Sequence, residues 1–228
     1  MSTELSPIGV RARIHAALGD PARLAIADTL ALADASPSDI AADLGMATNL
    51  LAHHLNVLAT AGVIERHRSE HDHRRSYLRL LPAAHSVLAK PTLPAPHRVV
   101  FICTRYSARS QLAAAVWARQ SHIRAASAGT HPAPRVHPRA VRIARRRGIP
   151  LDATRTARLD AVAQDGDLFI AVCDHVHETL PADHARLHWS VRDPVPIDTD
   201  DAFEAAYTDL AERIDRLATA ILAKETRP

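Results

Sequence analysis

The chain has 228 residues, 47% hydrophobic content and a formal net charge of +3. This is enough apolar material for two small cores, and so mild a charge permits a nucleic-acid partner without requiring one. No stretch approaches the roughly 18 apolar residues of a membrane span, and residues 1–10 lack the apolar segment of a signal peptide. We therefore expect a cytoplasmic protein without a membrane partner, whose two cysteines, Cys103 and Cys173, stay reduced.

Residues 1–81 are predicted to begin with four short helices. The first two are separated by Gly-Asp-Pro, because Asp20 is a good N-cap and Pro21 suits a first helical turn. A third helix is expected over Ser38–Leu44, and a fourth begins at Thr48. Helices in this number and order are typical of a mainly α domain.

A hairpin is predicted to follow the fourth helix. Its strands are Val63–Arg68 and Ser76–Leu80, and a polar tip over Ser69–Arg75 joins them. Helix, tight turn, helix and hairpin form the layout of a winged helix-turn-helix. Residues 82–97 contain four prolines and are interpreted as a linker with a short helix, because proline interrupts regular structure.

The second domain is expected over residues 98–228, where strands alternate with helices. The run Arg98–Cys103 is continuously apolar, as in a parallel strand that is buried on both faces. Alternation of this kind predicts a three-layer α/β domain with a four-stranded parallel sheet. Its other expected elements are strands Ile123–Ala128, Leu168–Cys173 and Leu187–Ser190 and helices Ser110–Gln120, His137–Arg147 and Asp200–Lys224.

Four segments of the first domain carry a family resemblance. They are Leu18-Gly19-Asp20-Pro21-Ala22-Arg23-Leu24, Asp39-Ile40-Ala41, His53-His54-Leu55-Asn56-Val57-Leu58 and Ala61-Gly62-Val63-Ile64. Together they resemble the arsenical-repressor (ArsR/SmtB) family of bacterial transcriptional repressors. The resemblance implies a homodimer that binds two half-sites of double-stranded operator DNA, in an arsenic or oxyanion response.

The same resemblance implies that the fourth helix enters the major groove. Asparagine can bond bidentately to adenine, and histidine or threonine can meet base edges or phosphates. The hairpin arginines would then neutralise flanking phosphates, although a charged hairpin can also be a solvated edge. The DNA-binding candidates are Thr48, Asn49, His53, Asn56, Arg66, Arg68, Arg74 and Arg75.

Metal sensing is not expected in this domain. Soft metals favour sulfur ligands, and the first domain contains no cysteine, so the family's cysteine metal motif is absent. His67, His71 and His73 could bind zinc, but a basic hairpin is a poor site for a cation. We predict no metal site.

The firmest functional feature is the segment Cys103–Ser110. It follows a buried strand and opens a helix, a junction where backbone amides converge and the helix dipole is positive. The thiolate form of a cysteine is favoured there, and Arg109 can clamp two oxygens of a tetrahedral oxyanion. The alternative is a buried cysteine at a strand end beside an unrelated arginine, but the strand–loop–helix context favours an oxyanion site.

This segment, with three later ones, resembles the low-molecular-weight protein tyrosine phosphatases and their thiol-dependent arsenate reductase branch. The later segments are Ser127-Ala128-Gly129-Thr130, Val172-Cys173-Asp174 and His188-Trp189-Ser190-Val191-Arg192-Asp193-Pro194. The resemblance implies that Cys103 is the nucleophile, Ser110 stabilises its thiolate and Asp193 is the general acid. The oxyanion, arsenate or phosphate, would lie within Thr104, Arg105, Tyr106, Ser107, Ala108 and Arg109.

Two departures from that family affect the prediction. Arg105-Tyr106 replaces the usual Gly-Asn, so a tyrosine would take a left-handed conformation at a cost of about 1 kcal/mol and lose bracing hydrogen bonds. Cys173 is a possible redox partner or a small core residue, and Leu180 stands near where a further relay cysteine would be. We expect no bound cofactor, and turnover would need an external low-molecular-weight thiol or a thioredoxin-like reductant.

Three functions stay open at this point. The first is an ArsR-type regulator whose fused second domain senses an oxyanion. The second is a bifunctional enzyme with arsenate reductase or low-molecular-weight phosphatase activity at Cys103. The third is a module that binds phosphoproteins without hydrolysing them.

Overall fold

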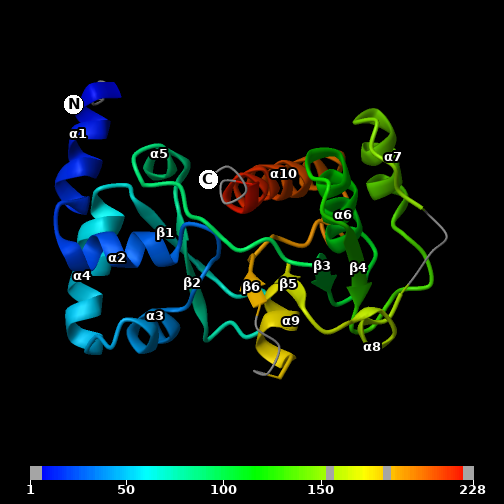
Figure 1. Ribbon diagram of the computed structural model, residues 1–228, viewed down its shortest axis with the longest axis horizontal. Helices are drawn as coiled ribbons and strands as arrows, with labels where there is room; N and C mark the ends of the chain where they lie inside the picture. Colours follow the sequence, from blue (N-terminus) through cyan, green and yellow to red (C-terminus); the bar gives the residue numbers. More distant parts are fainter. Residues whose placement is uncertain (1–6, 153–156, 182–185, 223–228) are drawn as a thin grey trace. The chain divides into compact units, whose positions relative to one another are not determined.

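The computed structural model describes residues 7–152, 157–181 and 186–222 (Figure 1). Contacts divide the chain into two compact units, one formed by residues up to 69 with 73–91, and the other by 70–72 with 92 onward. Across the described ranges, no helix has both the length and the apolar character that crossing a membrane requires.

The first unit consists of helices followed by a two-stranded antiparallel hairpin, as predicted. Strand β1 (Ile64–Arg68) pairs with β2 (Ser76–Leu80), with Ile64 opposite Leu80. The helices are α1 (Pro7–Leu18), α2 (Pro21–Thr29), α3 (Pro37–Asp43), α4 (Thr48–Thr60) and α5 (Pro82–His85).

Side-chain caps explain where two of these helices begin. Asp20 accepts a hydrogen bond from the Arg23 amide at the start of α2, as its N-cap position predicted. Ser36 and Asp39 form a reciprocal capping box at the start of α3, with Pro37 in its first turn. These local interactions fix the tight turns that separate the helices.

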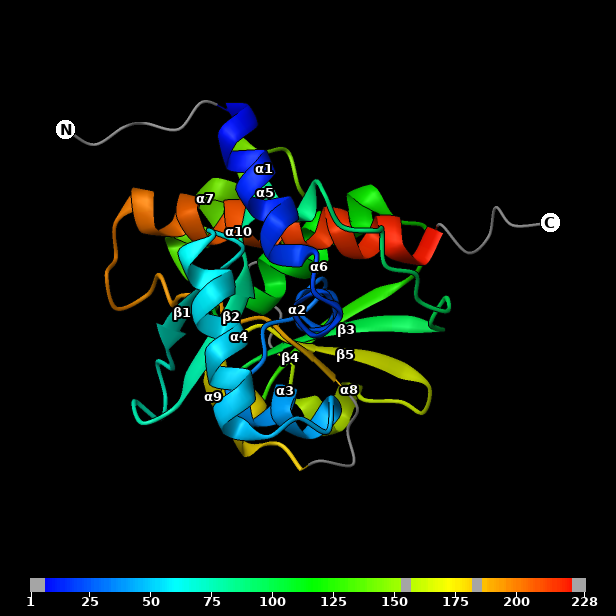
Figure 2. The ribbon, with the colours of Figure 1, turned by 90° about the vertical axis from the view of Figure 1, so that its left-hand side faces the viewer.

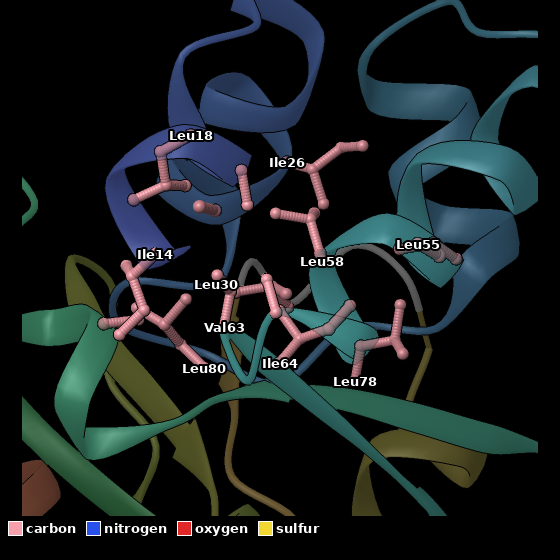
Figure 3. Packing of buried hydrophobic residues seen from close by; sticks show 14 of the residues in the cluster. Ile14, Leu18, Ile26, Leu30, Leu55, Leu58, Val63, Ile64, Leu78 and Leu80 are labelled. Carbon is pink, nitrogen blue, oxygen red and sulfur yellow. The ribbon is translucent and has the colours of Figure 1, made fainter. Parts of the chain in front are cut away.

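The core of the first unit lies between the helices and the hairpin (Figure 3). Ile14 of α1, Ile26 of α2 and Leu58 of α4 are fully buried and pack with residues of the hairpin. Each fully buried Leu or Ile stabilises the fold by about 1.5–3 kcal/mol before entropy is considered. One face of α4 therefore packs in the core, and its other face is exposed to solvent.

Two features of this unit were not predicted. Ala35 pairs with Leu78 through two backbone hydrogen bonds, which adds a short bridge to the hairpin. Part of the expected linker over residues 82–97 belongs to the first unit, because Ala84 of α5 is fully buried in its core. The boundary between the units accordingly lies at Pro91 and Thr92.

The second unit contains a four-stranded sheet in the order β4-β3-β5-β6, and every neighbouring pair is parallel. Figures 1 and 2 show α6 and α10 on one face of this sheet and α8 and α9 on the other. The predicted three-layer α/β fold is confirmed. The strands are β3 (Arg98–Cys103), β4 (Ala125–Gly129), β5 (Asp167–Ala171) and β6 (Arg186–His188), and the helices are α6 (Arg109–Gln120), α7 (Pro138–Arg146), α8 (Leu159–Val162), α9 (Asp174–Thr179) and α10 (Asp200–Leu222).

Several boundaries differ from the predictions. Strand β4 begins two residues later than expected, β5 ends at Ala171 instead of Cys173, and β6 ends at His188. The short helices α8 and α9 were not predicted, because four to six residues are too few to show a helical period. The predicted end of the last helix, Lys224, falls beyond the described residues.

The parallel sheet determines where a site can form. The segments after β3, β4, β5 and β6 all leave from the carboxyl edge of the sheet, because the four strands run in the same direction. Ligands bind at this edge in open α/β sheets. Segments from residues 104, 130, 172 and 189 onward are therefore brought together there.

Candidate oxyanion-binding site

Cys103 ends β3, and the loop Thr104–Ala108 leads into α6 at Arg109. Cys103 is buried, and its Sγ accepts a hydrogen bond from the Tyr106 amide at 3.2 Å. The Oγ of Ser110 lies 3.1 Å from the same sulfur. Two hydrogen-bonding groups therefore lie against the sulfur, and groups of this kind stabilise a negative charge on it.

Arg109 brings two distant segments to this loop. Its Nη1 donates to the Val191 carbonyl and its Nη2 to Asp193 Oδ2, both at 2.8 Å. Burial lowers the pKa of Arg109, but the charges of the Cys173 thiolate, which forms at the high pH where arginine titrates, and of Asp193 outweigh it, so the pKa lies above its ordinary value. The guanidinium thus stays charged, and it holds the candidate acid Asp193 beside the loop.

Tyr106 has the left-handed conformation that the sequence predicted, with φ of 53°. The sequence predicted that the loop would lose bracing hydrogen bonds at this position. In the structure, other residues supply such bonds to Tyr106. Gln111 Nε2 donates to the Tyr106 carbonyl at 2.8 Å, and the Ser127 hydroxyl donates to the Tyr106 hydroxyl at 3.1 Å. The phenol is buried, so packing also offsets the backbone strain.

Gly129, at the end of β4, makes room for this loop. A Cβ at that position would lie 2.8 Å from the Cβ of Tyr106 and 3.0 Å from the Thr104 carbonyl oxygen. Real side chains do not approach so closely, so the loop requires glycine at this position. The resemblance pointed to Ser127–Thr130, and the structure gives the steric reason for its glycine.

The outer side of the loop is fixed by backbone hydrogen bonds to the segment that follows β4. The carbonyls of Thr104, Arg105 and Ser107 accept from the amides of His131, Ala133 and His137, at 2.7–2.8 Å. Their side chains differ, since Arg105 is exposed and Ser107 half-buried, while Ala108 at the start of α6 is buried.

Comparisons with known proteins identify both units. Residues 98–227 match the family model described as low molecular weight phosphotyrosine protein phosphatase. The chain belongs to this family. Residues 20–66 match the model described as bacterial regulatory protein, arsR family. The protein thus joins a unit that matches the arsR-family model to a unit of the low molecular weight phosphatase family, and no curated protein matches it.

Solved structures similar to this phosphatase-family chain include two arsenate reductases and a tyrosine phosphatase. The arsenate reductase from Archaeoglobus fulgidus DSM 4304 is 28% identical, with 53% of this chain and 98% of that chain covered and a TM-score of 0.47. The thioredoxin-dependent arsenate reductase from Corynebacterium glutamicum is 25% identical over 57% and 64%, with a TM-score of 0.44. The tyrosine phosphatase Wzb from Escherichia coli K30 is 21% identical over 54% and 96%, with a TM-score of 0.48.

Cys173, the possible redox partner, lies beside the loop of this phosphatase-family unit. It is buried, and its Sγ is 3.5 Å from Thr104 Oγ1. Burial raises the pKa of Cys173, and the nearby Arg109 only partly offsets this. Cys173 is therefore a protonated thiol at neutral pH, and both cysteines are free.

A buried pair that the sequence reasoning did not single out lies next to Cys173. Asp174 Oδ1 is 3.0 Å from His188 Nε2, and both side chains are 2% exposed. Although burial raises the pKa of Asp174, hydrogen bonds from His188 and Ser190 lower it below its ordinary value. The pair ties the segment after β5 to the segment that leads from β6 to Asp193. Asp174 and His188 both lie within segments that resemble the phosphatase and arsenate reductase family, and this resemblance was the signal that could have pointed to them.

The DNA-binding candidates of the arsR-type unit lie on exposed surfaces. Thr48, Asn49, His53 and Asn56 are exposed on α4, whereas Leu51, His54, Leu55 and Leu58 are buried on its other side. Arg66, Arg68, Arg74 and Arg75 are exposed on the hairpin. His54 has its Nδ1 3.9 Å from Asp20 Oδ1, so it has a packing position and does not reach outward.

The hairpin carries His67, His71 and His73, the histidines whose chemistry suits zinc. Among the residues that the structure describes, no group of three or more His, Cys, Asp or Glu side chains is placed to hold a metal ion.

Proposed function

We propose that this protein is a transcriptional regulator whose second unit binds a tetrahedral oxyanion at the Cys103–Ser110 loop and thereby changes the affinity for DNA. The observation that carries the proposal is this loop, in which the Cys103 thiol, the buried Arg109 and Asp193 meet within a chain that also has an arsR-type match. An arginine clamp with converging amides is the chemistry that recognises arsenate or phosphate.

The DNA side of the proposal rests on α4 and the hairpin. A helix with exposed Asn and His, flanked by exposed arginines, suits base contacts in the major groove and phosphate contacts beside it. We propose that the protein binds double-stranded operator DNA as a homodimer, because two half-sites are read by two-fold symmetry. Its sensing would not use thiols of the first unit, which contains no cysteine. A cytoplasmic location suits two free cysteines.

The test is a DNA-binding titration of the full chain with and without arsenate, arsenite and phosphate. The wild type is expected to change its affinity for operator DNA with arsenate or phosphate, and Cys103→Ser is expected to lose the part of the response that needs the thiol. If every compound leaves DNA affinity unchanged in the wild type, the regulatory proposal fails.

A second candidate function is catalysis, and the position of Asp193 beside the Cys103 loop favours it. Cys103 Sγ can attack phosphorus as the bond to the ester oxygen breaks, and Asp193, once protonated and released from its ion pair with Arg109, can give that oxygen its proton. Water then hydrolyses the phosphocysteine and releases phosphate. With arsenate, two electrons from an external thiol pair would be needed to reach arsenite, and that pair would end as a disulfide.

Hydrolysis of p-nitrophenyl phosphate and thiol-coupled arsenate reduction separate these activities. Activity above the Cys103→Ser variant supports an enzyme, and no activity above it in either assay contradicts one. Cys173→Ser is the informative comparison. If Cys173 is a redox partner, this change lowers arsenate reduction and spares phosphate ester hydrolysis, whereas a packing role lowers both to the same extent.

A further inference from the structure

A pocket of about 730 Å³ lies within the second unit, directly beside the Cys103 loop. The loop contributes Arg105 and Ser107 to the lining of the pocket. Asp193, which pairs with Arg109, also lines it. The remaining wall comes from the segment between β4 and α7, from the start of α7 and from the residues after Asp193. The volume is that of a site for a small organic group. Bare arsenate or phosphate held at the loop would not fill it.

The pocket is positioned firmly relative to the loop. The carbonyls of Thr104, Arg105 and Ser107 are each bonded to backbone amides of residues 131–137, the segment that carries Arg135 and begins α7. A wall held by three main-chain hydrogen bonds keeps its distance from the oxyanion position. Pre-organisation of this kind reduces the entropy that binding must overcome.

The charges of the pocket are strongly unbalanced. Four arginines line it (Arg105, Arg135, Arg139 and Arg142) against two aspartates. Both aspartates already have partners, since Asp193 binds Arg109 and Asp198 binds Arg139 at 2.7 Å. Arg105 and Arg135 are exposed, and neither forms an ion pair with a residue that the structure describes. Two guanidinium groups are therefore available to a ligand.

Apart from Ser107 and His137, the rest of the lining is apolar. Val136, Val195 and three prolines contribute to it. A hydrocarbon or aromatic group can lie against these residues, with a charged end reaching an arginine. This combination suits a ligand that is anionic at both ends and apolar between them.

We infer that this pocket binds the remainder of a phosphomonoester that carries a second anionic group, with the phosphoryl group at the Cys103 loop and the second anion at Arg105 and Arg135. The inference rests on the proposed oxyanion binding at Cys103–Ser110 and names the class of ligand for that site. The second anion can belong to a small molecule or to an acidic residue of a phosphopeptide. Both present the same charge at the same arginines.

The experiment measures the binding of matched ligands to the full-length Cys103→Ser variant, which binds without turnover. Phenyl phosphate and 4-carboxyphenyl phosphate form one pair, and tyrosine-phosphorylated peptides flanked by Asp or by Asn form the other. The ligand with the second anion is expected to bind about threefold to tenfold more tightly, as for one or two partly exposed ion pairs. Added salt should reduce the difference. A preference in only one pair identifies the source of the ligand.

Arg135→Ala in the same background should lower the preference, because Arg105 alone then meets the second anion, and Arg135→Glu should abolish it. Arg145→Ala is the matched control, because Arg145 is exposed on α7 and lies outside the pocket lining. It should keep the parent's preference. Equal binding within both pairs, or a preference that survives Arg135→Ala and Arg135→Glu, overturns the inference and leaves oxyanion binding intact. If neither phenyl phosphate nor any other phosphorylated ligand binds, oxyanion binding itself fails and the inference fails with it.

Discussion

The sulfur of Cys103 and the hydroxyl oxygen of Ser110 lie 3.1 Å apart, although the two residues are seven positions apart in the chain. The loop between β3 and α6 turns back so that the first residue of the segment meets the last. Both side chains are buried, so this hydrogen bond acts in a medium where electrostatic interactions are strong.

We predict that Ser110→Ala slows alkylation of Cys103 by iodoacetamide by about tenfold at neutral pH, because a hydrogen bond to a charged group contributes about 1.5 kcal/mol or more. Mass spectrometry of the Cys103 peptide over time measures the rate. Ser107→Ala is the matched control, since its hydroxyl lies in the same loop and no hydrogen bond joins it to the thiol in the structure; it should leave the rate unchanged. Equal rates in Ser110→Ala and the wild type would show that the contact does not stabilise the thiolate.

Gly129→Ala is expected to destabilise the second unit by about 1–3 kcal/mol, because the added Cβ would overlap Tyr106 Cβ and the Thr104 carbonyl. Urea unfolding followed by tryptophan fluorescence measures this, since both tryptophans, Trp117 and Trp189, lie in the second unit. Phosphate binding should weaken as the loop moves.

Gly19→Ala is the control for this substitution. Its Cβ would meet nothing closer than 3.6 Å, and its φ is not in the left-handed region. This change should leave the fluorescence transition in place. A Gly129→Ala protein as stable as the wild type would mean that the loop shifts at no cost.

Asp167→Asn should cost stability at neutral pH and cost less in acid. Arg98 binds both carboxylate oxygens of Asp167, at 2.9 and 2.6 Å, and the Asp167 side chain is fully buried. Burial raises the pKa of Asp167, but the hydrogen bonds from Arg98 outweigh it, so the pKa lies below its ordinary value of 3.8.

Because the folded state holds the carboxylate ionised more strongly than the unfolded state does, its stabilisation is fully present above the unfolded pKa. It is lost as pH falls through the lower, folded pKa. The difference in unfolding free energy between wild type and Asp167→Asn should be about 1–3 kcal/mol at pH 7 and shrink steadily towards pH 3. Urea titrations at a series of pH values measure it. A difference that stays constant with pH would contradict the role given to this carboxylate.

Arg66→Ala and Arg68→Ala should each weaken DNA binding for every sequence alike. Both side chains are exposed on the hairpin, and arginines that bind phosphates read no sequence. For each phosphate that the variant no longer neutralises, the slope of log K against log salt should become shallower by about 0.9. Fluorescence anisotropy with operator and scrambled DNA at several salt concentrations measures it. Arg145→Ala, the same change outside the first unit, should keep the wild-type slope; if all three variants share one slope, the hairpin does not bind phosphates.

Much of the fold could be predicted because its signals are local. Asp20 and Pro21 are typical of a helix start, and the apolar run Val99–Cys103 is typical of a parallel strand that is buried on both faces. The alternation of strands and helices then implied a parallel sheet, which the structure confirms. The short helices α8 and α9 could not be predicted, because helices of four and six residues are stabilised mainly by what they pack against.

By itself, the sequence determined the chemistry that the site has available: a cysteine seven residues before a serine at a strand–helix junction, with an arginine beside it. Only the tertiary structure decided which distant groups act on that loop. It brought Asp193 to Arg109 across 84 residues, set Ser127 against the Tyr106 hydroxyl, and placed Gly129 where any side chain would collide with the loop. The reason is physical. Capping, strand burial and loop spacing are properties of neighbouring residues, whereas the partner of a buried charge or a strained backbone depends on which strand ends the sheet places side by side.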